Sequence, residues 1–535
     1  MTEERRAHRE VIETDVVVAG FGPVGVTAAN LLGTYGIRTE VVEREQSVFP
    51  RARAVTVNDW TLRIFQSFGM AERVMADMEE NSVLRWKTYQ GREVFRLAAR
   101  DSGLGYPGSM MIYQPAMETV LREGVARFEG TINVRFGEEV TNVHQDSDHV
   151  EVAVRSHDGT ERRIRARYAL ACDGGSSAVR SQMGVAMLGE THETEWIVVD
   201  AEMLRWWPGC KDLVFWSDPD RPVVDIPLSL GHHRWEFPLR PDERKEDFDS
   251  DEAIWTLLRS MGRTPEEVRI ERHAFYVHHV RHAERWRVGR VLLLGDAAHL
   301  MPPWAGQGMQ SGIRDAANAA WKLREVLEGR LRESLLDTYE AERAPQVAKV
   351  TQLSQKLGML IASRDPRFVT ARNTLGPVLK RCTPLTRAIM SGSAPALSGG
   401  WFSATPSKSG SVGQMVPQPP ISTSQGRRAV FDEALGNGFA LVGYDKDPRI
   451  ATPAIHLAAW ERLGARPVTV RNRAGQATSP NDYIDHTGLL GDWMRRHNSS
   501  VVVVRPDHFV AASDADGLHV PGDVRASTAT SAVAL

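Results

Sequence analysis

The spacing of hydrophobic and polar positions predicts an α/β protein. A β-branched run at 14–19 is followed by a glycine-rich turn, a helical pattern that extends to about Tyr35 and a second β-branched run at 38–43. This succession is typical of a βαβ unit with parallel strands. Before residue 180, helical spacing recurs at 59–79 and 113–128, and strand-like runs occur at 131–143, 149–155 and 161–171.

The pattern changes between residues 182 and 285, where tryptophans are frequent and short strand-like runs alternate with Pro/Gly turns. This segment predicts an inserted domain with an antiparallel β-sheet and some helix. Helices dominate from 311 to about 391, and a segment rich in Ser, Gly, Pro and Gln precedes a last α/β module. The predicted organisation is a discontinuous first domain at 1–181 and 286–391, in which 82–112 can instead join the inserted sheet, an insert at 182–285, a linker or long ordered loop at 392–427 and a C-terminal domain at 428–535.

Composition excludes several classes of protein. A chain of 535 residues with 42% hydrophobic and 25% charged residues is typical of a soluble, multidomain protein. The net charge of −3 gives no general affinity for nucleic acid or anionic membranes. The charged N-terminus has no signal-peptide core and no run is long enough to span a bilayer, so we expect a cytoplasmic protein. Three widely spaced cysteines, Cys172, Cys210 and Cys382, predict neither a disulfide framework nor a metal site.

A glycine-rich turn carries the first chemical signal. Residues 20–25, Gly-Phe-Gly-Pro-Val-Gly, follow the first strand and precede the first helix, as a dinucleotide-binding turn requires. Gly20 allows the tight turn, Gly22 allows the backbone to approach a pyrophosphate, and Gly25 allows close packing of helix and strand. Glu43 ends the second strand at the expected spacing of about 20 residues, where an acid accepts hydrogen bonds from a ribose. This turn alone does not distinguish FAD from NAD.

Two later motifs add to this signal. The segment 172–180, which begins Cys172-Asp173-Gly174, follows a strand that ends at Ala171. The segment 295–310 begins with Gly295-Asp296 after the buried run 291–294, passes through two prolines and a glycine turn, and leads into a helical pattern. This arrangement is typical of a site that binds a polar cofactor at a helix N-terminus: a strand, an acid, a glycine turn and the start of a helix.

With all three motifs present in this order, residues 14–390 resemble the class A flavoprotein aromatic hydroxylases, which have the p-hydroxybenzoate hydroxylase fold. The resemblance is strongest to the 3-(3-hydroxyphenyl)propionate hydroxylase and phenol hydroxylase branch, on segments 50–52 (Pro-Arg-Ala), 234–237 (Arg-Trp-Glu-Phe) and 311–318. It implies a Rossmann-like FAD-binding domain of the GR2 type, an inserted mixed-sheet substrate domain and a thioredoxin-like C-terminal domain. That last domain has no cysteine after Cys382, so dithiol chemistry is excluded and packing or homodimer support is expected.

The resemblance also implies site residues. The turn at Gly20, Gly22 and Gly25 would hold the FAD pyrophosphate, and Asp296 would bind the ribityl chain. Asp173 and Gly174 would serve both FAD and NAD(P)H, with Arg180 in support. The full set expected to contact the cofactor is Gly20, Gly22, Pro23, Val24, Gly25, Glu43, Arg44, Arg53, Gln114, Asp173, Gly174, Asp296, Pro303, Gly306, Gln307, Gly308 and Met309. Gln310 departs from the family pattern, in which Asn is common at this position.

For the substrate, the resemblance implies a cavity in the inserted sheet. Period-two alternation places Trp235 and Phe237 on one face of a strand. We expect the substrate to contact these residues together with Phe215, Trp216 and Trp304. His278, His279 and Arg281 are candidates for tuning the proton of a substrate hydroxyl, because imidazole titrates near neutrality.

The implied reaction hydroxylates a phenolic substrate. FAD would be reduced by NADH or NADPH as co-substrate, O2 would form a C4a-hydroperoxyflavin, and one oxygen would pass to an electron-rich ring. Two alternatives stay open: Baeyer–Villiger or another oxygenation of an aromatic polyketide, and a flavin-scaffold binding protein that has lost turnover. The intact Asp173, Asp296 and Gly306–Gly308 argue against loss of turnover.

Overall fold

The computed structural model describes residues 11–81, 83–98, 101–379, 395–407, 409–472, 479 and 482–522. The chain folds into two compact units. The first consists of residues up to 102, 106–327 and 343–392, and the second of residues 103–105, 328–342 and 393 onward.

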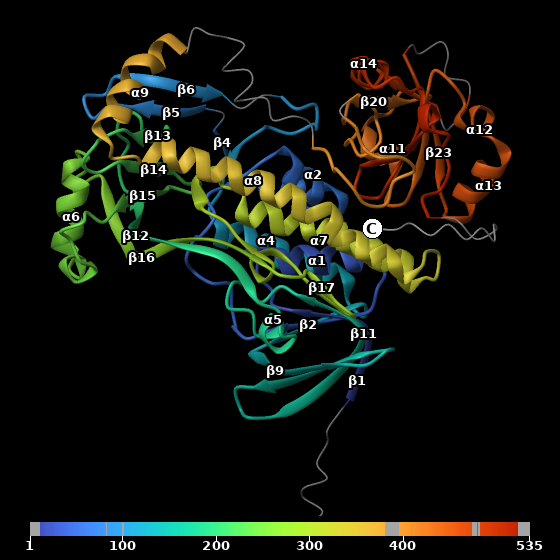
Figure 1. Cartoon of the computed structure of the whole chain (residues 1–535), viewed down its shortest axis with the longest axis horizontal. Helices are drawn as coiled ribbons and strands as arrows, with labels where there is room; N and C mark the ends of the chain where they lie inside the picture. Colours follow the sequence, from blue (N-terminus) through green and yellow to red (C-terminus); the bar gives the residue numbers. More distant parts are fainter. Residues whose placement is uncertain are drawn as a thin grey trace, which may run out of the picture. The chain divides into compact units, whose positions relative to one another are not determined.

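The first unit is built around a mixed sheet of eight strands, six of which follow the order β17-β18-β11-β1-β2-β8. Figure 1 labels β1, β2, β9, β11 and β17 of this sheet. The pairs from β18 to β8 are parallel, as the βαβ pattern predicts. The hairpin of β9 and β10 pairs with the first part of β11, along the same edge on which the end of β11 pairs with β18. The strands are β1 (Val11–Ala19), β2 (Thr39–Glu43), β8 (Ile132–Phe136), β9 (Glu138–Gln145), β10 (Val150–Ser156), β11 (Glu161–Ala171), β17 (Arg287–Val288) and β18 (Val291–Leu293).

Helices α1 (Pro23–Thr34) and α7 (Gly308–Leu327) pack closely against each other. Glycines permit this contact: a Cβ at Gly295 or Gly312 would lie 2.8 or 2.5 Å from the Val24 side chain. Helix α8 (Thr338–Ala362) lies along α7, to which Arg343 donates a hydrogen bond at the Ser311 carbonyl. The remaining helices of this unit are α2 (Asp59–Ser67), α3 (Ala71–Met75), α4 (Gln114–Val125), α5 (Ala178–Gln182), α6 (Asp251–Ser260) and α9 (Pro366–Leu379).

The helical pattern predicted over 59–79 is in fact two helices. The chain turns between α2 and α3 at Gly69, whose φ of +74° is a left-handed conformation that favours glycine. The pattern at 113–128 corresponds to α4 followed by one 3-10 turn at Ala126–Phe128. Hydrophobic periodicity therefore located these segments correctly but did not detect the break at Gly69.

A second sheet of eight strands has the order β19-β16-β12-β15-β14-β13-β5-β6. One face packs against α6 and buries Trp207, Trp235 and Phe237; the other buries Trp86, Trp196 and Phe215. Strands β5 and β6 come from the 82–112 segment, for which the sequence allowed either domain. The strands are β5 (Val83–Lys87), β6 (Glu93–Ala98), β12 (Met187–Met203), β13 (Leu213–Trp216), β14 (Val223–Pro227), β15 (His232–Pro238), β16 (Val268–Ala283) and β19 (His299–Leu300). A small third sheet joins β3 (Thr56–Val57), β7 (Met110–Met111) and β4 (Glu79–Glu80).

The second unit contains a seven-stranded sheet in the order β21-β20-β24-β23-β22-β25-β26. Strand β20 (Pro420–Thr423) belongs to it, so the sheet begins before residue 428. Its core includes Phe431, Val468, Trp493 and Val502. The other elements are β21 (Arg428–Val430), β22 (Ala440–Tyr444), β23 (Arg466–Arg471), β24 (Asp482–Asp485), β25 (Val501–Val504), β26 (Val510–Ser513), α11 (Phe431–Leu435), α12 (Pro448–Ala451), α13 (Ala454–Arg462) and α14 (Leu489–Arg496).

A buried ion pair ties the second unit together. Arg505 donates to both carboxylate oxygens of Glu342, at 2.9 and 2.8 Å, and also binds Asp507. The thioredoxin-like character expected for this unit stays a prediction. Among the helices in the described part of the chain, none combines the length and apolar character needed to cross a bilayer.

Candidate active site

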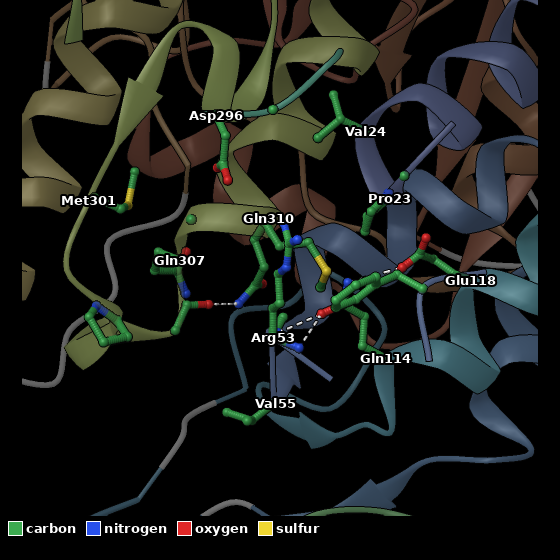
Figure 2. A pocket seen from close by; sticks show the side chains of 18 of the residues that line it. Pro23, Val24, Arg53, Val55, Gln114, Glu118, Asp296, Met301, Gln307 and Gln310 are labelled. Carbon is green, nitrogen blue, oxygen red and sulfur yellow. Dashed lines mark hydrogen bonds between the residues drawn. The ribbon is translucent and has the colours of Figure 1, made fainter. Parts of the chain in front are cut away.

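A cavity of about 930 Å³ lies within the first unit, between its two large sheets. One half is lined by the turns that follow β1, β2, β11 and β18 and by the start of α7. The other half is lined by side chains of β5, β13, β14 and β15 and by α8. Figure 2 shows residues of α1, α4 and the 296–310 segment pointing toward this common space.

The glycine turn after β1 is shaped by close backbone contacts. Gly20 has a φ of +94°, and a Cβ there would lie 2.5 Å from the Cys172 carbonyl oxygen. A Cβ at Gly25 would collide with the Gly20 carbonyl oxygen. A Cβ at Gly22 would meet no protein atom within 4 Å, although Gly22 lines the cavity. Among the described residues no side chain caps the N-terminus of α1, so its first N–H groups are available to an anionic ligand.

Glu43 is fixed at the carboxyl end of β2. Its Oε2 accepts a hydrogen bond from Phe21 N at 2.7 Å, and its Oε1 accepts one from Glu45 N at 2.9 Å. Each carboxylate oxygen has a second lone pair, and Glu43 lines the cavity beside Arg44. A ribose hydroxyl can therefore bind here without breaking either backbone contact.

Helix α4 supports the loop that carries Arg53. The Gln114 side-chain oxygen accepts hydrogen bonds from Arg53 N and Ala54 N, at 2.9 and 2.6 Å, and its amide nitrogen donates to Glu118 at 3.0 Å (Figure 2). Arg122 donates to the Phe21 carbonyl at 2.9 Å. Glu118 and Arg122 both line the cavity but were missed from sequence, although their four-residue spacing from Gln114 placed them on the same helix face.

The turn after β11 is held by Asp173 and Arg180. Asp173 accepts hydrogen bonds from Ser177 Oγ at 2.5 Å and Val179 N at 3.1 Å, so it organises the start of α5 while lining the cavity. Arg180 donates to the Gly175 and Ala297 carbonyls, at 2.9 and 3.1 Å. Arg180 therefore connects the two acidic turns that the sequence identified separately.

Asp296 directs its carboxyl into the cavity (Figure 2). The side chain is accessible from the cavity although it lies deep in the protein, and burial raises its pKa above the ordinary range. Among the described residues none hydrogen-bonds to this carboxyl. The turn that carries it is fixed from behind by Asp315, which accepts hydrogen bonds from Gly295 N at 3.0 Å and His299 Nε2 at 2.7 Å.

Gln310, the position that departs from the family pattern, is a brace. Its side-chain oxygen accepts hydrogen bonds from Asn58 N at 2.9 Å and Thr61 Oγ1 at 3.0 Å, while its amide nitrogen donates to the Gly306 carbonyl at 2.6 Å. The longer Gln side chain thus connects the start of α2 to the glycine turn before α7. Gly306, Gln307, Gly308 and Met309 all line the cavity at that turn.

The sheet wall of the cavity differs from the sequence prediction. Phe215 lines the cavity together with Trp304, as expected, and Leu84, Leu213, Val224 and Ile226 extend this apolar wall. Trp216, Trp235 and Phe237 were expected there, but they face the opposite side of the sheet and pack in or against the α6 core. Alternation correctly placed Trp235 and Phe237 on one face. It could not identify which face meets the cavity, since both faces of this sheet are buried.

None of the three residues suggested for proton chemistry lines the cavity. His278 is buried behind Trp304, with ring centroids 4.9 Å apart, and also packs against Trp196. His279 contacts Thr191 Oγ1 at 2.9 Å outside the cavity, and Arg281 lies on β16 opposite Leu300. Among the described side chains of the second sheet, the titratable one that lines the cavity is Glu236, which lies within the 234–237 family pattern but was not predicted as a site residue.

Comparison with known proteins decides the family. The model of an FAD binding domain family matches residues 13–354. A 3-(3-hydroxy-phenyl)propionate/3-hydroxycinnamic acid hydroxylase of Mycobacterium sp. (strain KMS) is 36% identical, with 94% of this chain and 88% of the relative covered. The chain belongs to the FAD-dependent aromatic hydroxylases. A hydroxylase of the same description from Burkholderia cenocepacia (strain HI2424) is also 36% identical and covers 94% of this chain and 95% of its own.

Solved structures give the same fold for this hydroxylase. The flavin-dependent monooxygenase PieE, solved in complex with FAD and substrate, has a TM-score of 0.77 over 94% of this chain and 96% of its own, at 23% identity. Aklavinone-11 hydroxylase, solved with FAD and aklavinone, has a TM-score of 0.74 at 24% identity and covers 95% and 97% of the two chains. The model of an HcaD C-terminal domain matches residues 413–521 in the second unit.

The cavity of the hydroxylase fits its FAD cofactor. The open side of Gly22 and the uncapped start of α1 suit a pyrophosphate, and Glu43 suits the ribose. Asp296 would hold the ribityl hydroxyls, and the start of α7, which lines the cavity, would lie near the flavin ring. When bound, FAD supplies hydride acceptance and the activation of O2. Every residue predicted to contact the cofactor lines this cavity except Gly25, which packs behind the turn.

Proposed function

We propose that this hydroxylase binds a phenolic ring against the wall formed by β13, β14 and β15, and adds one oxygen atom to it at the expense of NADH or NADPH. The observation that carries the proposal is the continuity of one cavity from the glycine turn at 20–25 to that wall. A substrate ring bound against the wall would lie in the same cavity as the flavin ring. The names of the curated relatives, which describe hydroxylases of meta-hydroxylated aromatic acids, support a phenolic substrate.

The protein's part in this reaction is to position the ring and to exclude water. The wall presents Phe215, Val224 and Ile226, and α8 adds Leu353 and Leu357. An apolar surround strengthens the few polar contacts inside it and limits side reactions with water. Trp304 closes the wall near the glycine turn before α7, where it packs edge-to-face on Trp196 with ring centroids 4.8 Å apart.

The test uses the purified FAD-bound protein. A panel of meta-substituted phenols is screened for stimulation of NADH and NADPH oxidation, and the products are analysed by mass spectrometry after reaction under isotopically labelled O2. We expect a product that carries one labelled oxygen on the aromatic ring. NAD(P)H oxidation that yields only hydrogen peroxide for every phenol would contradict the proposal.

The same experiment separates the two alternatives. A labelled oxygen inserted into a carbon–carbon bond of a polyketide would show Baeyer–Villiger oxygenation. Tight binding of aromatic ligands without any NAD(P)H oxidation would show a flavin-scaffold binding protein. Polycyclic substrates belong in the panel because one structural relative was solved with aklavinone.

A further inference from the structure

We propose that Glu236 is the residue of this hydroxylase that accepts a hydrogen bond from the ring hydroxyl of the substrate, and so orients and activates the ring. This inference rests on the proposed function, because it assigns one side chain to the phenol which that function requires. It is carried by the position of Glu236 on the second sheet, by its incomplete set of partners and by its opening onto the cavity.

Strand register makes Glu236 a single carboxyl in an apolar row. Glu236 pairs with Val198 on β12 and with Val224 on β14, and Phe215 on β13 pairs with Val224 in turn. Phe215, Val224 and Glu236 all line the cavity, and Glu236 is 6% exposed. An ionisable group in such a row costs free energy unless it is hydrogen-bonded, so its presence calls for partners.

The protein supplies only part of those partners. Tyr276 donates its hydroxyl to Glu236 Oε2 at 2.8 Å, whereas Arg234 Nη1 lies 4.0 Å from Oε1, beyond hydrogen-bond distance. Within the described part of the chain, Oε1 accepts no hydrogen bond. A carboxylate offers about four lone-pair sites, so Oε1 can accept a donor from the cavity. The group that a phenol brings into an apolar cavity is an O–H donor.

Electrostatics suits Glu236 to this role. Burial raises its pKa, whereas Arg234 and the Tyr276 hydroxyl oppose that rise and Asp200 adds to it. A carboxylate whose pKa is raised toward that of a phenol is a stronger proton acceptor than an exposed one. A hydrogen bond to such a carboxylate withdraws the hydroxyl proton and increases electron density on the ring. That increase is what transfer of an electrophilic oxygen to the ring requires.

Arg234 acts as a positioning residue that connects Glu236 to the flavin half. Its guanidinium binds Asp200 at 2.6 Å and donates to the carbonyls of Ala52 and Arg53, at 2.5 and 3.0 Å. The amide of Arg53 in turn donates to Gln114. These contacts fix the position of β15 relative to the loop that carries Arg53. It also gives a physical reason for the co-occurrence of the 50–52 and 234–237 patterns.

The test compares Glu236→Gln with the control Glu271→Gln on FAD-bound protein. Glu271 is an exposed carboxyl of the same sheet, paired with His232 outside the cavity. Binding of a phenol and of its methyl ether is measured from the change in flavin absorbance. We expect the wild type and the control to prefer the phenol by roughly 10- to 100-fold, the range for a hydrogen bond to a charged group, and Glu236→Gln to reduce that preference about tenfold.

A pH profile adds a readout that a purely structural role would not move. In the wild type, kcat/KM should fall at acidic pH as Glu236 becomes protonated, at a higher pH than an ordinary Glu because its pKa is raised. Glu236→Gln should lack this acid limb. Tyr276→Phe keeps the carboxyl and removes a hydrogen bond that lowers its pKa, so its acid limb should move to higher pH. This second variant keeps the test decisive if Glu236→Gln does not fold.

Two results would overturn the assignment: an unchanged preference for phenol over methyl ether in Glu236→Gln, or an acid limb that is the same in all variants. A failure of the proposed function looks different. In that case the wild type gives no hydroxylated product from any phenol, while the binding comparison still reports whether Glu236 recognises the ring hydroxyl.

Discussion

The two halves of the cavity differ in whether backbone or side chains form most of their lining. The half that fits FAD is made mainly of backbone: glycine turns after parallel strands and the start of α1, together with three acids at strand ends, Glu43, Asp173 and Asp296. The half that we propose holds the substrate is made of side chains that point from one face of a mixed sheet. A site formed by backbone requires particular residue types, such as glycine, at fixed spacings. Such a site can therefore be recognised as a motif in the sequence. A site on a sheet face can change by substitution alone, so specificity can vary while the cofactor site persists.

The largest expected effect tests whether the two faces of the second sheet really have different roles. Phe237→Ala removes a fully buried ring from the α6 side, and we expect a loss of about 3–5 kcal/mol in stability with little change in KM for the aromatic substrate. Phe215→Ala removes a ring from the cavity wall, and we expect a raised KM and more hydrogen peroxide per NAD(P)H. Thermal unfolding and steady-state kinetics of both variants check this. Equal KM effects in the two would contradict the assignment of the faces.

The second prediction concerns the backbone-built half. In Gly25→Ala the new Cβ would collide with the Gly20 carbonyl, so the turn must shift. We expect a loss of about 3 kcal/mol from overpacking and very low FAD content. Gly22→Ala is the matched control, because its Cβ meets no protein atom within 4 Å but borders the cavity. That variant should unfold like the wild-type apoprotein and still bind FAD poorly. Thermal unfolding of both apoproteins and titration with FAD measure the difference.

The third prediction separates cofactor binding from stability at one residue. Asp296→Ala should weaken FAD binding by roughly tenfold, since it removes an acceptor for ribityl hydroxyls. The apoprotein should be no less stable at neutral pH, because burial raises the pKa of this carboxyl and its ionised form therefore costs folding free energy. Flavin occupancy after gel filtration and apoprotein melting temperature test the two halves of this statement. Unchanged occupancy would remove Asp296 from the cofactor site.

Much of the nucleotide half was predictable because its chemistry is local in sequence. The strand, turn and helix around Gly20–Gly25 and the position of Glu43 follow from spacing, and the structure places all of them as that spacing requires. Glu118 and Arg122 were within reach of the same reasoning, since they continue the four-residue spacing of Gln114. On a helix that already carries one site residue, residues at four-residue spacing from it are therefore predicted to face the same site.

The substrate half was less predictable for a physical reason. In β15 the residues alternate between two buried faces, so the hydrophobic pattern does not identify which face meets the cavity, the one with Glu236 or the one with Trp235 and Phe237. The strand partners that decide the question, Val198 and Val224, come from other parts of the chain. His278 was chosen for its chemistry alone, and packing against Trp196 and Trp304 places it behind the wall. The available signal was the pair of charged residues Arg234 and Glu236, which alternation places on the same face of this buried strand.

The smallest expected effect concerns the residue at which this chain departs from its family pattern. Gln310→Asn shortens the brace by one methylene, so it cannot reach both Asn58 N and the Gly306 carbonyl as Gln310 does. We expect a loss of about 1 kcal/mol, the net value of one hydrogen bond, with FAD content preserved and a small change in the flavin spectrum. Gln310→Glu keeps the acceptor toward Asn58 and loses the donor toward Gly306, so it isolates the second contact. If both variants melt and absorb like the wild type, the brace contributes nothing measurable, and Gln and Asn are interchangeable at this turn.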